Sequence, residues 1–211
     1  LHRTMPAAFS EDGRGDRNGD DMHVQDKDTD RLEAFSDGVF AIAITLLILE
    51  IKVPHSGEHG LWHALGQLWP SYLAFFTSFL TIGIVWLNHH AQFDRFASVD
   101  RTLNFINLLL LLWVSFVPFP TALVAEYLRD GSAADQQAAV TVYSATFLAL
   151  SLTFFALWRY ANRADLLTQD LSERQVAALT RRNGVGQVAY AASFALAFES
   201  AIASLVLCTL T

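Results

Sequence analysis

The chain has 211 residues, of which 53% are hydrophobic and 12% aromatic, a composition rich in apolar residues for a soluble domain. Its formal net charge is −7, and its single cysteine, Cys208, excludes an intrachain disulfide or a thiol-based metal cluster within one chain. It has no phosphate-cradling glycine loop, no G-x-S-x-G motif and no convincing base–nucleophile pair. The sequence therefore does not indicate catalysis, and we expect no resident metal, no cofactor and no nucleic-acid partner.

Residues 1–30 form an acidic tail, with eight acidic and four basic residues and few large apolar ones. This composition and the lack of periodicity are typical of a disordered segment. No apolar segment follows its basic residues, so it is not a signal peptide. We predict two parts: a disordered acidic tail, 1–30, and a membrane domain, 31–211.

The first apolar span, from Leu32 to Val53, is long enough to cross a bilayer as a helix, since ~20 residues at ~1.5 Å each cover ~30 Å. Pro54 cannot continue the helix. Asp37 lies inside this span, and an ionisable group there is costly unless it has a partner or faces water. Asp37 is therefore a candidate functional residue.

The same helix carries an aliphatic stripe. At ~100° per residue, six side chains fall within about 40° of one line, with Thr45 on its shoulder: Phe35, Gly38, Ile42, Leu46, Leu49 and Val53. Ser36 and Asp37 point well away from that line. Periodicity alone favours a lipid-facing stripe, because lipid is as apolar as leucine.

Three histidines that could bind a metal follow the first span. His55, His59 and His63 recur every four residues, but Pro54 and nearby glycines argue against a regular helix, so we expect solvated loop histidines.

The second span, Trp69 to about Phe93, ends in a polar run that includes His89 and His90. Trp86 and His90 lie one turn apart on one face. Two interpretations compete: a metal or haem site on the histidines, or a polar cluster that satisfies Arg31, Ser36 and Asp37. Haem would need a second axial ligand or another arrangement of its fifth ligand, and no other span contains a histidine.

The third span runs from Arg101 to about Tyr127, and Pro118 and Pro120 should kink or end its helix. The fourth, about 137–160, is rich in small residues and should pack inside the bundle.

The C-terminal third begins with a polar segment, 161–183, which is too charged to cross and has a helix start at Ser172. The final apolar run, 186–211, fits one tilted helix or two short helices broken near Glu199 and Ser200, or else the chain stops before a sixth helix. We predict an all-α membrane helix bundle with five to six transmembrane helices.

The distribution of basic residues predicts the orientation in the membrane. Lysine and arginine concentrate in the loop after the second span and in the segment after the fourth, whereas the other two loops have one each, Lys52 and Arg129. Basic loops face the cytoplasm, so we expect a cytoplasmic N-terminus. We expect the protein to lie in the plasma membrane.

The first span also carries a specific motif. Arg31-x-x-x-Phe35-Ser36-Asp37, followed by the apolar run from Gly38, resembles the first-helix signature of the transmembrane protein 175 family of potassium channels. The resemblance to bacterial members implies a homotetramer in which the first helices line a central pore, and 31–211 would be its channel domain. By register it implies aliphatic constriction layers at Ile42, Leu46 and Leu49, with Thr45 one turn past the first layer.

The resemblance implies a similar role for the second span, because family members place a tryptophan and a histidine near the Phe-Ser-Asp motif. Trp86 and His90 match these positions, so the resemblance favours the polar cluster over a metal or haem site. The function expected is a cation channel permeable to potassium, with a modest preference over sodium; the alternative is a membrane metal transporter or oxidoreductase built on His89, His90 and Asp37.

Overall fold

A computed structural model describes residues 16–55 and 59–210, and the regular secondary structure of this described part is helical apart from one isolated bridge between Phe96 and Leu167. The helices, in chain order, are α1 (Asp16–Leu46), the short 3-10 helix η1 (Leu47–Glu50), α2 (Gly60–Gln67), α3 (Trp69–Phe93), α4 (Arg101–Phe116), α5 (Pro118–Asp130), α6 (Ala133–Arg163), α7 (Glu173–Leu196) and α8 (Ala201–Leu210). The predicted all-α class is confirmed.

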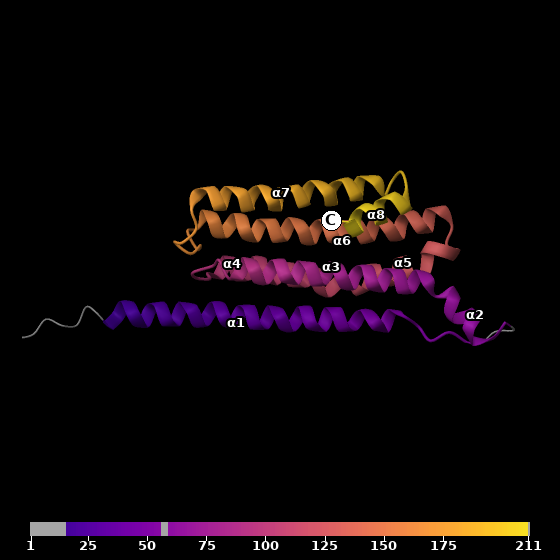
Figure 1. The fold of residues 1–211 in the computed structure, drawn as a ribbon, viewed down its shortest axis with the longest axis horizontal. Coiled ribbons are helices and arrows are strands. Elements are labelled where there is room, and N and C mark those ends of the chain that lie inside the picture. The colour runs from indigo at the N-terminus through magenta and orange to yellow at the C-terminus, as the bar shows by residue number, and fades with distance from the viewer. Residues whose placement is uncertain (1–15, 56–58, 211) are drawn as a thin grey trace, which may run out of the picture.

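The long helices lie nearly parallel, with α1 along one edge of the bundle and α7 along the opposite edge (Figure 1). The helix α6 packs against α4, α5, α7 and α8, whereas α1 packs against α3 and α4. Among the residues fully buried in the core are Phe40 of α1, Leu110 of α4, and Phe147 and Leu157 of α6. The helix α6, which is rich in small residues, thus lies inside the bundle, as its composition predicts.

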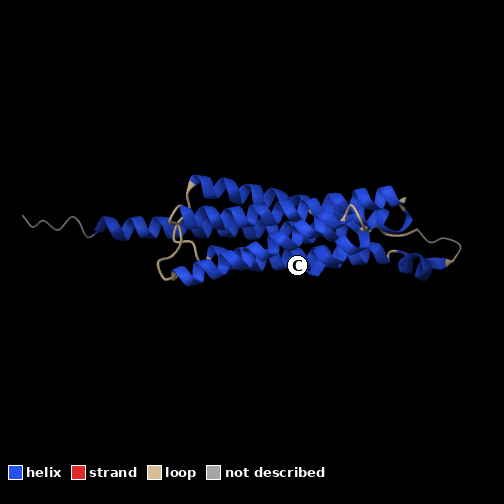
Figure 2. Cartoon of the chain, turned by 90° about the horizontal axis from the view of Figure 1, so that it is seen from above, coloured by secondary structure: helices blue, strands red, loops and turns tan. Residues whose placement is uncertain are grey.

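The helix α1 begins at Asp16 rather than near Arg31, so residues 16–30 differ from the expected disorder. Its N-terminal part extends beyond the end of the bundle (Figure 2). A helix that is already nucleated can grow by one hydrogen bond per added residue, which explains why the polar segment continues the membrane helix. Residues 1–15 lie outside the described chain.

The other end of α1 tightens into η1 before the chain becomes extended at Ile51. In a 3-10 helix, residues three apart eclipse one another. Leu46 and Leu49 therefore stay on the same side of the chain although the helix type changes between them.

Proline and capping residues set the other boundaries. The third span breaks at Val117, immediately before Pro118, as its prolines predict. Ser132 and Ser172 begin α6 and α7 with capping boxes. The loop before α4 pairs with the loop before α7, since the amide of Ala97 donates to the carbonyl of Leu166 (2.8 Å).

The last apolar run is two helices. The chain leaves α7 after Leu196 and starts α8 at Ala201, so the break falls at the predicted place. Ser193 and Ser204 hold the two helices together, because each hydroxyl donates to the other residue's carbonyl, at 2.9 and 2.8 Å.

Four segments of the described chain are long and apolar enough to cross a membrane: Thr29–Glu50, Trp69–Phe93, Arg101–Leu128 and Ala133–Arg163. The helices α7 and α8 accompany them in the bundle. Four spans by length and composition, plus this pair, accord with a multi-span membrane bundle.

One local prediction was wrong. The chain forms the helix α2 from Gly60, where a loop was expected. Gly60 adopts φ +79°, a conformation that glycine tolerates, and this turn lets the helix start instead of preventing it. His63 lies on α2 and its ring contacts that of His59 at 5.2 Å between centroids, while Gly57 lies outside the described residues.

Candidate pore face and polar cluster

The helix α1 has one face in the bundle and one face outside it. Phe40, Ala43 and Leu47 are buried against the other helices. Ile42, Leu46 and Leu49 remain 61%, 42% and 68% exposed in the single chain. The predicted aliphatic stripe therefore lies on the face that the chain itself leaves uncovered.

Thr45 is exposed on the same outer side of α1. Its hydroxyl donates to the carbonyl of Ile42 at 2.8 Å. Because a hydroxyl that donates one hydrogen bond keeps its oxygen lone pairs, the Thr45 oxygen can still accept a bond or contact a cation.

A buried hydrogen-bond chain joins α1 to α3 through α4. Asn107 of α4 donates to the hydroxyl of Ser36 at 2.9 Å, and Ser36 donates to the carbonyl of Leu32 at 2.8 Å. His89 lies 2.9 Å from the Asn107 amide oxygen, so its Nε2 carries the proton that it donates. Ser36, His89 and Asn107 are fully buried, and each needs such a partner in an apolar bundle.

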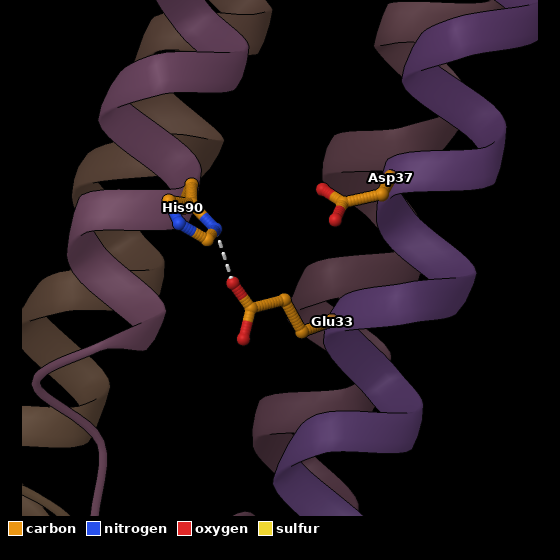
Figure 3. Close-up of side chains that lie close together, drawn as sticks. All are labelled: Glu33, Asp37 and His90. Atoms are coloured by element: carbon orange, nitrogen blue, oxygen red, sulfur yellow. Dashed lines mark ion pairs between the residues drawn. The ribbon is translucent and has the colours of Figure 1, made fainter.

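A second contact between α1 and α3 lies beside this chain. The indole N–H of Trp86 donates to the Asp37 carboxylate at 2.8 Å. His90 forms an ion pair with Glu33, with 2.5 Å between the imidazole nitrogen and the carboxylate oxygen (Figure 3). Trp86 and His90 also stack, with their ring centroids 6.1 Å apart.

The structure also shows which side chains could hold a metal. Glu33, Asp37 and His90 place one ligand atom each within 4.8 Å of one another (Figure 3). Each of the three already has a partner within the protein, because His90 pairs with Glu33 and Trp86 bonds Asp37. The three side chains are therefore explained as contacts between α1 and α3, without a metal.

Two residues of the predicted cluster lie elsewhere. Arg31 and Phe35 are exposed on α1, and among the described residues Arg31 makes no hydrogen bond or ion pair with the cluster. Position along the helix explains this, because Arg31 and Phe35 point away from the side that carries Ser36 into the bundle.

Three further residues complete the cluster but were not predicted: Glu33, His89 as a buried hydrogen-bond donor, and Asn107. Asn107 had a readable signal, since it is an amide within an otherwise apolar span. Glu33 also had one, because it lies one turn before Asp37 on the same face.

Comparisons with known proteins bear on this arrangement. The family model described as "Endosomal/lysosomal potassium channel TMEM175" matches residues 31–118, which include the second half of α1 and all of α3 and α4. A protein of Streptomyces collinus named as a potassium channel is 53% identical over 173 residues, which cover 81% of this chain and 83% of that protein. The chain belongs to the TMEM175 family.

A second potassium channel, from Chamaesiphon minutus, is 48% identical over 191 residues, covering 87% of this chain and 91% of that protein. A crystal structure from Chamaesiphon minutus, titled as a homologue of a lysosomal potassium-selective TMEM175 channel, matches with a TM-score of 0.77 and 45% identity. The match covers 87% of this chain and 94% of that one.

Family membership confirms several expectations from the sequence. The chain is an integral membrane protein of a family of ion channels, not of enzymes. A family of potassium channels implies membrane lipid and potassium ions as partners, and it gives no reason to expect a cofactor.

Proposed function

We propose that this protein is a potassium-permeable cation channel in which four copies surround a central axis and present the outer face of α1 to the pore. The observation that carries the proposal is the exposure of Ile42, Leu46 and Leu49 on a helix otherwise packed into the bundle. These positions coincide with the constriction layers that the family register implies. An exposed aliphatic face also suits lipid, so the proposal rests on the register and the exposure together.

The three layers would form stacked aliphatic rings over ~10.5 Å of helix. A narrow apolar tube opposes the passage of hydrated ions, because water leaves it readily. Potassium gives up water more easily than sodium does, so such a tube favours potassium modestly. The hydroxyl oxygen of Thr45, which keeps its lone pairs, supplies one polar contact beside these rings.

The polar cluster has a positioning role in this proposal. The hydrogen bonds from Asn107 to Ser36 and from Trp86 to Asp37 fix the rotation of α1 about its axis. A fixed rotation keeps the aliphatic face directed away from α3 and α4. Arg31 and Phe35 lie on the exposed side, where they are available to a neighbouring copy.

The orientation that we propose places the N-terminus in the cytoplasm and the channel in the plasma membrane. It rests on the arginines of the loop that follows α3 and of the segment that follows α6. We do not propose a histidine-based metal transporter or oxidoreductase, because His89 and His90 are each engaged in a contact between helices.

Flux of potassium into liposomes tests the proposed function. Purified protein in vesicles should pass potassium above the level of empty vesicles, and sodium more slowly. Protein that is correctly assembled but passes no potassium would contradict the channel. A preparation that passes both ions equally would contradict the aliphatic constriction.

A further inference from the structure

A groove lies between α3, α6 and α7, away from the exposed face of α1. It has a volume of about 530 Å³. Its walls are largely apolar, and they include Ile84 and Val85 of α3, Leu150 and Phe154 of α6, and Val185 and Tyr190 of α7. One end of the groove is polar, where Asn88, Arg182 and Asn183 line it.

A small pit continues this polar end. Asn88, Phe154, Arg182 and Asn183 line both the groove and the pit, so the two lie side by side. The pit has a volume of about 10 Å³, which is room for about one water-sized atom.

Gln92 lies in the pit and is incompletely satisfied. It is only 3% exposed, and neither atom of its amide has a hydrogen-bond partner among the described residues. A buried amide without a partner costs free energy, and native structures contain few of them. A ligand oxygen that enters the pit would accept a hydrogen bond from the Gln92 amide.

The electrostatics of the pit select the sign of such a ligand. Arg95 and Arg182 line it, and no aspartate or glutamate lines the described pit or groove. Neither arginine forms an ion pair with a described residue.

We propose that this site binds an anionic phospholipid. The phosphate lies between Arg95 and Arg182, which suit it because guanidinium groups form charge-assisted hydrogen bonds to phosphate oxygens. One oxygen reaches the amide of Gln92, and an acyl chain follows the apolar groove along Ile84 and Val185. The groove favours a phospholipid over free phosphate, because free phosphate would leave the apolar walls unused.

The location fits the source of such a lipid. The polar end of the groove lies toward the ends of α3 and α6 that precede the arginine-bearing loops, the side that we assign to the cytoplasm. Cytoplasmic leaflets carry anionic lipids, and basic residues near the surface attract them. The proposal concerns lipid binding, and its test does not depend on ion flux.

Native mass spectrometry of the assembled protein tests the site, with phosphatidylglycerol and phosphatidylcholine as probes. The unchanged protein should retain phosphatidylglycerol in preference to phosphatidylcholine. Arg182→Gln should weaken phosphatidylglycerol binding about tenfold, as expected for one lost charge-assisted hydrogen bond. Arg95→Gln provides a second, independent variant should Arg182→Gln fail to assemble.

Arg174→Gln is the matched control, because Arg174 is an exposed arginine of the same helix that does not line the pit or the groove. It should bind phosphatidylglycerol like the unchanged protein. An equal loss in Arg174→Gln would show a general charge effect and overturn the site. Displacement of the lipid by inorganic phosphate alone would overturn the phospholipid and leave a simple anion site.

Discussion

At the scale of single residues, Asn107 connects α1 to α3, and its removal should weaken the bundle. Its amide bonds Ser36 on one side and His89 on the other. Asn107→Ala leaves the buried Nε2–H of His89 without its acceptor, at ~1–3 kcal/mol, and removes the donor to Ser36, which keeps only its bond to the carbonyl of Leu32. The melting temperature of the assembled protein should therefore fall.

Asn104→Ala is the control for this substitution, one turn earlier on α4. The Asn104 amide oxygen is buried without a hydrogen-bond partner among the described residues, so its removal strands no group that we can identify. Its melting temperature should stay near that of the unchanged protein. Equal losses in the two variants would show that the cluster is not what stabilises this region.

Asp37 should matter for packing more than for ion choice. Asp37→Ala leaves the partly buried indole N–H of Trp86 without its acceptor, whereas Asp37→Asn keeps an oxygen in place for that bond. Assembly, measured by size-exclusion chromatography in detergent, should be impaired in Asp37→Ala and largely kept in Asp37→Asn. A fully assembled Asp37→Ala protein that has lost potassium preference would place Asp37 in the permeation path.

Sequence reasoning identified the participants of this cluster better than their pairings. A polar residue in an apolar span must have a partner, and this rule pointed to Ser36, Asp37 and Trp86. It does not say which partner, because that depends on how three helices rotate against one another. In the structure, His90 forms an ion pair with Glu33, and Ser36 accepts a hydrogen bond from Asn107.

At the scale of elements, Asp100 joins the start of α4 to α6. Its carboxylate caps the backbone amide of Leu103 at 2.7 Å and accepts a hydrogen bond from the Tyr160 hydroxyl at 2.5 Å. Partial burial raises the pKa of Asp100. These two bonds and a third from the Thr102 backbone lower the pKa by more than burial raises it, so the net pKa lies below its usual range. The ionised carboxylate is therefore the form that the fold prefers.

The stabilisation by Asp100 should depend on pH. A carboxylate whose pKa is lowered in the fold stabilises the fold at pH values above its ordinary pKa. This stabilisation is lost as the pH falls through the folded-state pKa. Asp100→Ala should reduce the melting temperature at neutral pH, since a lost cap costs ~1 kcal/mol. The gap to the unchanged protein should narrow below about pH 4.

Asp100→Asn is the matched variant, because asparagine is also a good helix cap. It should lose less stability than Asp100→Ala at neutral pH, and its gap to the unchanged protein should narrow in the same way. A gap between Asp100→Ala and the unchanged protein that stays constant from neutral to acidic pH would contradict the role of the charge.

The boundaries of elements were predictable where a residue fixes the backbone. Pro118 ends α4, Ser172 caps α7, and the polar pair Glu199 and Ser200 marks the break before α8. The long start of α1 was not predictable from composition, because its acidic residues favour disorder while the adjoining helix favours continuation. The helix α2 was missed because a glycine can end a loop as well as break a helix.

At the scale of the whole molecule, the orientation in the membrane is testable with one added cysteine. Val53 is 87% exposed just after η1, on the side that we assign to the exterior, and the native Cys208 is buried. A membrane-impermeant thiol reagent should label Val53→Cys in intact cells, with the unchanged protein as the background. Labelling of Val53→Cys only after lysis would mean that the opposite orientation is correct.

The arrangement of copies was the part least accessible from sequence. Periodicity placed Ile42, Leu46 and Leu49 on one line, and the structure leaves that line uncovered. Both facts suit lipid or a pore, because the hydrophobic effect does not distinguish lipid from a neighbouring apolar side chain. The distinction depends on what the outer face of α1 meets, and this requires a measurement of permeation.

The most direct measurement is the potassium-to-sodium permeability ratio of Ile42→Asn in liposomes or planar bilayers. If Ile42 forms an aliphatic ring, the amide wets the constriction, so the ratio should fall and sodium current should rise. Ile48→Asn is the control, since Ile48 is also exposed, at 52%, but lies off the line of Leu46 and Leu49 in η1. Its ratio should match that of the unchanged protein. Equal changes in both variants, or no change in either, would contradict the assignment of this face of α1 to the pore.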